Sequence, residues 1–213
     1  MICGRAGGRA VGRVAAALAL PACPLARLPA QVSVHLTAGA RYTTTLVRDS
    51  IVTSFSVRPA VAPALALTVG TPIDTTGKWT VEAILDWSHS DMIRHDQDGS
   101  TQSLGGLGTL GVSVGMRRHL LPWLSARASV GGLKYLPASE TGIFSLGSGS
   151  LFALGGLAVD AAPPFGLRWG LAFETRLDLH RFITPALRAE GFQDSRPVVR
   201  VALGVRAGLG AAR

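Results

Sequence analysis

Apolar and polar side chains alternate along the segment Leu167-Arg-Trp-Gly-Leu-Ala-Phe-Glu-Thr-Arg-Leu-Asp-Leu179. The odd positions carry mainly leucine and aromatic side chains, and the even positions carry charged or small ones. A β-strand places successive side chains on opposite faces, so this period of two predicts a strand between an apolar and a polar environment. The segment is about twice as long as a usual soluble strand and long enough to cross a bilayer at a tilt.

The same alternation returns along the rest of the chain. It is found in residues 32–43, 54–69, 79–88, 110–117, 124–131, 151–159 and 199–209. The links are alternately tight and long, with the longer, more polar ones at 94–105, 136–150 and 183–197. Tight turns at one end and long loops at the other are typical of bacterial outer-membrane barrels. We therefore predict an all-β fold, an eight-stranded antiparallel up-and-down transmembrane β-barrel. Pro59 and Pro63 predict bulges or weak pairing, because proline cannot donate to a sheet ladder.

The first 30 residues have the composition of a secretory signal. Three arginines within residues 5–13 precede a short apolar run at 14–20, and Ala30 offers a small residue for cleavage. We predict a signal peptide over residues 1–30 and an outer-membrane β-barrel over residues 31–213. The apolar run is too short for a spanning helix.

Both cysteines of the chain, Cys3 and Cys23, lie within this predicted signal. Cleavage after Ala30 would leave a mature chain without a thiol, whose stability must come from burial, metal or membrane. The sequence Leu20-Pro-Ala-Cys23 also resembles a lipobox, so lipidation of Cys23 stays open.

The formal net charge of +8 does not indicate a nucleic-acid partner. Four of the 21 basic residues and none of the 13 acidic ones precede residue 31, so the rest of the chain carries about +4. The longest basic cluster is the pair Arg117-Arg118. A nucleic-acid interface needs a concentrated basic patch, which this sequence lacks.

The alternation alone does not say which face lines the inside, since a soluble barrel of the lipocalin type has an apolar interior. Small residues surround the charges on the polar face, as a narrow tube would require, and lysine occurs only at Lys78 and Lys134. Trp79 and Trp87 share a face and lie about 26 Å apart along a strand, or roughly 20 Å along the membrane normal at a ~40° tilt. This separation approaches the apolar band of such barrels, so we predict lipid outside and charge inside. The predicted aromatic girdle is Tyr42, Phe55, Trp79, Trp87 and Trp123.

The polar face then supplies a charge network in the lumen. Its predicted members are Arg41, Arg58, Glu82, Asp86, Arg117, Arg127, Arg168, Glu174, Arg176, Asp178, Arg200 and Arg206. Buried charges must pair, and side chains fill an eight-stranded barrel, so a packed ion-pair core is expected rather than a large pore. Eight arginines face four acids in this set, so water or anions would share the space.

The sequence holds no convincing catalytic or metal site. Ser88-His-Ser-Asp91 is no local triad, because neighbouring residues of a strand point to opposite faces. Residues 96–100 begin like a calcium loop but lack its third acid and closing glutamate, and the five histidines have no metal-ligand spacing. The Gly-Gly-Leu triplets at 105–107, 131–133 and 155–157 are interpreted as bends of the barrel wall.

Over roughly residues 32–209 this architecture resembles the small eight-stranded outer-membrane barrels, such as the transmembrane domain of outer membrane protein A and its X-type relatives. The resemblance implies a monomer in the outer membrane that contacts membrane lipid and, during biogenesis, the barrel assembly machinery. We expect no cofactor and no enzyme activity, because the sequence shows no catalytic triad and no metal-ligand spacing. The expected role is structural or surface interaction. The alternatives are a small anion-leaning channel, a lipid-modifying enzyme and a soluble secreted ligand-binding barrel.

Overall fold

The protein is represented by a computed structural model that describes residues 32–49, 54–144, 151–164 and 170–209. The predicted signal peptide of residues 1–30 and the predicted lumen residue Arg168 lie outside these ranges.

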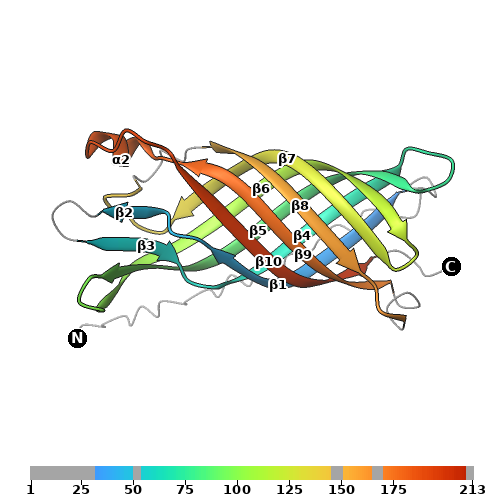
Figure 1. The fold of residues 1–213 in the computed structure, drawn as a ribbon, viewed down its shortest axis with the longest axis horizontal. Helices are drawn as coiled ribbons and strands as arrows, with labels where there is room; N and C mark the ends of the chain where they lie inside the picture. The colour runs from blue at the N-terminus through green and yellow to red at the C-terminus, as the bar shows by residue number, and fades with distance from the viewer. Residues whose placement is uncertain (1–31, 50–53, 145–150, 165–169, 210–213) are drawn as a thin grey trace, which may run out of the picture. The chain divides into compact units, whose positions relative to one another are not determined.

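Eight strands close into an antiparallel ring (Figure 1). They are β1 (Ser33–Thr43), β4 (Ala62–Pro72), β5 (Trp79–Asp96), β6 (Thr101–Leu121), β7 (Leu124–Pro137), β8 (Leu151–Ala161), β9 (Leu171–Phe182) and β10 (Arg196–Gly208). Each strand pairs with the next in this order, and β10 pairs with β1 to close the ring. The predicted fold class is confirmed.

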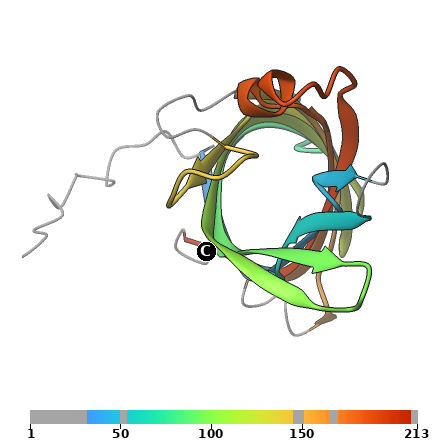
Figure 2. The same cartoon turned by 90° about the vertical axis from the view of Figure 1, so that its left-hand side faces the viewer.

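The ring carries additional structure at one end, which we call the crown (Figures 1 and 2). It consists of β2 (Val47–Asp49), β3 (Phe55–Pro59), α2 (Pro185–Ala189), residues 138–144 and 190–195, and the tip of the β5–β6 hairpin. β3 pairs with the outer part of β5, and β2 pairs with β3. The opposite end carries the turns that connect β4 to β5 and β6 to β7, and we call it the turn side.

The crown differs from the predicted set of polar loops. Residues 94–105 were expected as a loop, yet β5 and β6 continue through most of them as a paired hairpin. The link before β10 contains α2, which Thr184 caps by accepting a hydrogen bond from the Leu187 backbone N–H at 3.2 Å. This helix has five residues, and no helix within the described ranges is long and apolar enough to cross a membrane.

The segment 54–69, which was predicted as one strand, forms two strands. β3 ends at Pro59 and β4 begins at Ala62, where the predicted interruption occurs. Val57 and Pro59 are buried in β3, whereas Ala62 and the alternate residues after it are buried in β4. The two-residue break therefore shifts the alternation by one position. Arg58 consequently does not share the inward face of β4, and its predicted lumen position is wrong.

Below the crown, the wall is apolar outside and polar inside. On β5, Leu85 is 45% exposed, whereas its neighbours Ile84 and Asp86 are buried. Outward valines and leucines on the other strands are similarly exposed, and the inward positions bury arginine, glutamate and aspartate. This is the arrangement of a barrel surrounded by lipid.

The polarity of the wall inverts above Trp87. The inward residues Met92 and Leu107 are apolar and 1% exposed, whereas outward Asp91 and nearby Gln102 are polar and exposed. The crown end therefore has the polar exterior and apolar core of a water-soluble domain. At the level of Trp87 the exposed surface of the wall changes from apolar to polar.

The Gly-Gly-Leu glycines differ in how closely the neighbouring strand approaches. A Cβ on Gly131 would lie 2.1 Å from the Val112 carbonyl oxygen and 2.5 Å from the Ser113 Cα, whereas a Cβ on Gly155 meets nothing within 4 Å. We expect Gly131→Ala to lower the free energy of unfolding by about 1–3 kcal/mol, because the β6 backbone must move.

Gly155→Ala is the matched control and should change stability by less than about 0.5 kcal/mol. Urea titration of the barrel folded into lipid vesicles measures both. Equal losses would show that backbone approach is not the reason for Gly131.

Candidate functional site

The lumen buries eleven charged side chains, each 6% exposed or less. They are Arg41, Glu82, Asp86, Arg117, Arg127, Asp160, Glu174, Arg176, Asp178, Arg200 and Arg206. Their ion pairs divide them into two groups with no ion pair between the groups among the described residues. We call them the turn-side cluster and the crown-side cluster.

Glu82 of β5 is the centre of the turn-side cluster. Its Oε1 accepts from Arg206 Nη2 at 2.9 Å and lies 2.9 Å from Arg117 Nε, and its Oε2 accepts from Arg127 Nη1 at 3.1 Å. Four strands supply these side chains, because every second residue of each strand points inward. One carboxylate thus links opposite parts of the wall.

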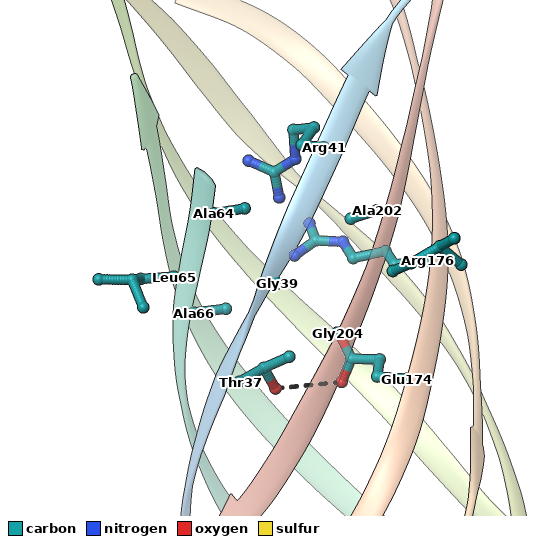
Figure 3. Close-up of a pocket in the computed structure, with 11 residues that line it drawn as sticks. Thr37, Gly39, Arg41, Ala64, Leu65, Ala66, Glu174, Arg176, Ala202 and Gly204 are labelled. Carbon is teal, nitrogen blue, oxygen red and sulfur yellow. Dashed lines mark hydrogen bonds between the residues drawn. The ribbon is translucent and has the colours of Figure 1, made fainter. Parts of the chain in front are cut away.

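Two further acids complete this cluster. Glu174 Oε1 accepts from Arg127 at 3.2 Å, and its Oε2 accepts from Thr37 at 3.4 Å (Figure 3). Asp160 Oδ2 lies 2.8 Å from Arg117 Nη2 and accepts from Ser125 at 3.2 Å. Three arginines face three carboxylates in the turn-side cluster, so its formal charges balance.

The crown-side cluster converges on Asp86. The Asp86 carboxylate is 2.8 Å from Arg41 Nη1, 3.3 Å from Arg176 Nη2 and 3.6 Å from Arg200 Nη2. Asp178 pairs only with Arg176 Nε, at 2.7 Å, among the residues the structure describes. Three arginines therefore face two carboxylates, and this cluster has one positive charge in excess.

Arg200 is the least neutralised of these arginines. Its side chain is fully buried, and its Nη2 donates to Thr109 Oγ1 at 2.9 Å. Its Nε and Nη1 have no hydrogen-bond partner within the described part of the chain. A buried guanidinium with two unsatisfied donors is costly unless another group reaches it.

The structure brings together ten of the twelve predicted network residues. Arg58 lies elsewhere, half-buried, and its Nε donates to His95 Nε2 at 3.2 Å. Arg168 lies outside the described ranges. Asp160 was missed because the strand at 151–159 was predicted to end one residue before it, although it continues the inward parity of that strand.

The predicted girdle residues occupy two kinds of position. Tyr42, Trp79, Trp87 and Trp123 lie on the outer surface, with 36–49% of each side chain exposed. Phe55 instead packs against the buried apolar core of the crown, and the Arg94 guanidinium lies 4.5 Å from the centre of its ring. Its place in the crown excludes Phe55 from a ring at the lipid surface. The membrane-anchoring role of the other four stays a prediction.

A buried apolar cluster lies inside the barrel above the crown-side cluster. Tyr135 and His180 form the boundary, with Tyr135 Oη 3.0 Å from His180 Nε2. Phe144, Phe152 and Phe182 contact the Tyr135 ring, with ring centres 5.4–5.7 Å away. The full cluster, which we call the plug, is Leu46, Val47, Val57, Met92, Leu107, Leu133, Tyr135, Ile143, Phe144, Phe152, Leu154, Phe182, Leu187 and Val198.

Two open cavities lie in the crown, beside the plug. One of about 710 Å³ is lined by Phe55, Leu104, Ile143 and other residues. The second, of about 670 Å³, has walls of Phe182, Ile183 and residues 191–197 among others. Both have the size of small-molecule sites and mix apolar walls with charged rims.

The residues considered for catalysis do not assemble. His89 is exposed on the outer surface, where its ring stacks on Trp87 with centres 6.4 Å apart. Ser88 is buried on the inward face and binds Arg41 and Thr109. No group of three or more potential metal ligands is found in the described ranges.

The protein is thus a ring of eight strands with charged side chains inside and exposed apolar side chains outside. The fold is that of the small eight-stranded outer-membrane barrels. The solved structure of OprG from Pseudomonas aeruginosa is similar over 85% of this chain and 97% of its own, with a TM-score of 0.50 and 12% identity. AlkL, solved in DMPC lipid bilayers, is similar over 88% of this chain and 97% of its own, with a TM-score of 0.51 and 10% identity. No protein-family model and no curated protein matches the sequence.

Proposed function

We propose that this protein is a non-conducting barrel of the bacterial outer membrane that acts through its crown. The observation that carries the proposal is the plug, which fills the crown end of the barrel and supports the crown from below. The lumen provides rigidity in this proposal, and the crown provides the interaction surface.

The packing of the lumen opposes the channel alternative. A permeating ion would have to separate the Asp86 pairs and then cross the ring contacts around Tyr135. Breaking buried ion pairs and opening an apolar core are both costly. The two clusters and the plug lie one above the other along the axis, so neither obstacle can be bypassed.

The crown has the properties expected of a recognition surface. Loops held by a rigid scaffold often carry binding residues, and here strands β2 and β3 and helix α2 give them secondary structure. Leu187 of α2 enters the plug, which ties the crown to the barrel core. The partner would approach from the aqueous side opposite the turns.

The remaining alternatives are less well supported. Exposed Leu85, Val112 and Leu177 would be unfavourable on a soluble secreted barrel. The outward, stacked position of His89 gives a lipid-modifying enzyme no base aligned with a serine. Membrane lipid around the wall and the assembly machinery during insertion remain the expected partners, with the barrel as a monomer.

We expect the purified barrel to produce no discrete conductance steps in planar bilayers. The reason is that a permeating ion would have to pass both the buried ion pairs and the plug. Recordings in 1 M KCl, with a known porin as the positive control, measure this. Stable anion-selective steps that disappear in Arg200→Glu would instead support the channel alternative.

An exchange of the crown segment 184–195 for a short glycine-containing turn tests the surface role. The exchanged barrel should still insert and keep heat-modifiable gel mobility. Cells displaying it should lose attachment to one another and to coated surfaces, relative to cells displaying the intact chain. Attachment that survives the exchange, at equal surface display, would contradict a role for this part of the crown.

A further inference from the structure

The crown-side cluster has a buried positive charge that no carboxylate of the chain neutralises. Its three guanidinium groups share Asp86, and Asp178 neutralises only one further charge. The residues outside the described ranges contain no aspartate or glutamate. The three other buried acids, Glu82, Asp160 and Glu174, belong to the turn-side cluster, and the remaining acids of the chain are not buried.

Arginine cannot remove this excess by losing a proton, because its side chain stays protonated in proteins. An uncompensated charge in a low-dielectric interior strongly destabilises the fold. The donors that remain unpaired point to the same conclusion, since Arg200 Nε and Nη1, Arg176 Nη1 and Arg41 Nε have no partner within the described residues. An acceptor that carries negative charge would satisfy these donors.

Small residues leave space beside this cluster. A cavity of about 20 Å³ is lined by Arg41 and Arg176, by Glu174 and Thr37 at its turn-side end, and by mainly small residues of β1, β4 and β10 such as Gly39 (Figure 3). This volume suits one occupant of about the size of a water molecule. Figure 3 shows both guanidinium groups on the same side of the Thr37–Glu174 contact.

The turn-side mouth of the barrel has a composition that favours entry of anions. An open cavity of about 180 Å³ there is lined by His35, Arg117, His119 and Arg206, with Asp160 as the acid. The buried apolar plug lies at the other end. We therefore infer that an anion enters from the turn side and passes the turn-side cluster.

We propose that the crown-side cluster binds one small inorganic anion, of the size of chloride, in the cavity beside Arg41 and Arg176. The ion accepts hydrogen bonds from the unpaired guanidinium donors and neutralises the excess charge. Binding of the ion stabilises the folded barrel, because the site exists only when the strands are closed.

The first test compares halide with a large anion. The unfolding temperature of the barrel in nanodiscs is measured in sodium chloride and in sodium gluconate at equal ionic strength. Chloride should raise the unfolding temperature in a concentration-dependent way. Crystals grown with sodium bromide should show an anomalous peak within hydrogen-bond distance of Arg41 or Arg176.

Two variants remove the excess charge in opposite ways. Arg200→Met deletes one cation, and Thr109→Asp adds a carboxylate where the Thr109 hydroxyl now lies 2.9 Å from Arg200 Nη2. Both should lose the chloride dependence, although Arg200→Met lowers the unfolding temperature and Thr109→Asp raises it. Thr109→Val is the matched control, since it removes the hydroxyl without changing the charge, and it should keep the dependence.

Two results would overturn the proposal. Equal unfolding temperatures in chloride and gluconate, together with no bromide peak in the lumen, show that water alone solvates the arginines. A chloride effect that persists in Thr109→Asp and Arg200→Met places the ion elsewhere. If Arg200→Met fails to fold, Thr109→Asp still decides, because it keeps Arg200 and replaces the hydroxyl that accepts from this arginine with a carboxylate.

Discussion

Glu82→Gln should destabilise the folded barrel by about 3–5 kcal/mol, the cost of leaving buried charges without their partner. Glu82 is 1% exposed and contacts Arg117, Arg127 and Arg206. The substitution keeps the shape of the side chain and removes only its charge, so the balanced turn-side cluster would have three arginines and two acids. Urea or guanidinium titration of the barrel in lipid vesicles, followed by tryptophan fluorescence, measures the change.

Asp96→Asn provides the matched control. Asp96 pairs with Arg94 at 2.7 Å in the crown, but both side chains are about one-third exposed. Exposed pairs contribute about 0–1 kcal/mol, so a small effect is expected. If the Glu82 and Asp96 variants were equally stable, the lumen clusters would not contribute to the stability of the fold.

Leu177→Arg should destabilise the inserted barrel by about 2–4 kcal/mol, the cost of arginine at the bilayer midplane. Leu177 lies near the middle of β9, 45% exposed, between the outward residues Leu157 and Val201 on the neighbouring strands. Arginine at this position must bring a charge into the hydrocarbon. Folding yield into vesicles, read by heat-modifiable gel mobility, and denaturant titration measure the effect.

The control places the same residue at the edge of the membrane. Leu121 is exposed at the end of β6, beside the turn to β7, and arginine near an interface costs about 0–1 kcal/mol. A Leu121→Arg variant as damaging as Leu177→Arg would show that the effect does not follow membrane depth, and the lipid-facing assignment would be wrong.

The alternation of side chains predicted the ring and most of the lumen network, because the period of two directly reports which face a residue occupies. It succeeded where strands are uninterrupted, as at Glu174, Arg176 and Asp178 on β9. It failed at Arg58, because the break before Ala62 changes the phase of the pattern, and Pro59 marks an interruption without showing that the phase changes.

The alternation of side chains did not predict the crown, and the reason is different. Its inward residues are apolar, so Leu107 and Tyr135 have the inward parity but not the polarity that the rule assigned to the lumen. The rule that inward residues are polar holds only where the wall faces lipid.

Asp160 was missed for a simpler reason. The predicted strand ended at residue 159, one residue too early, so the inward position of Asp160 was not recognised.

The inversion of wall polarity at Trp87 fixes the depth at which the barrel sits in the membrane. Sliding by two residues along a strand, about 7 Å, would bring Asp91 into hydrocarbon in one direction or lift apolar residues such as Leu85 into water in the other. The polar exterior of the crown therefore opposes movement of the barrel through the membrane in one direction, and the exposed apolar wall opposes it in the other.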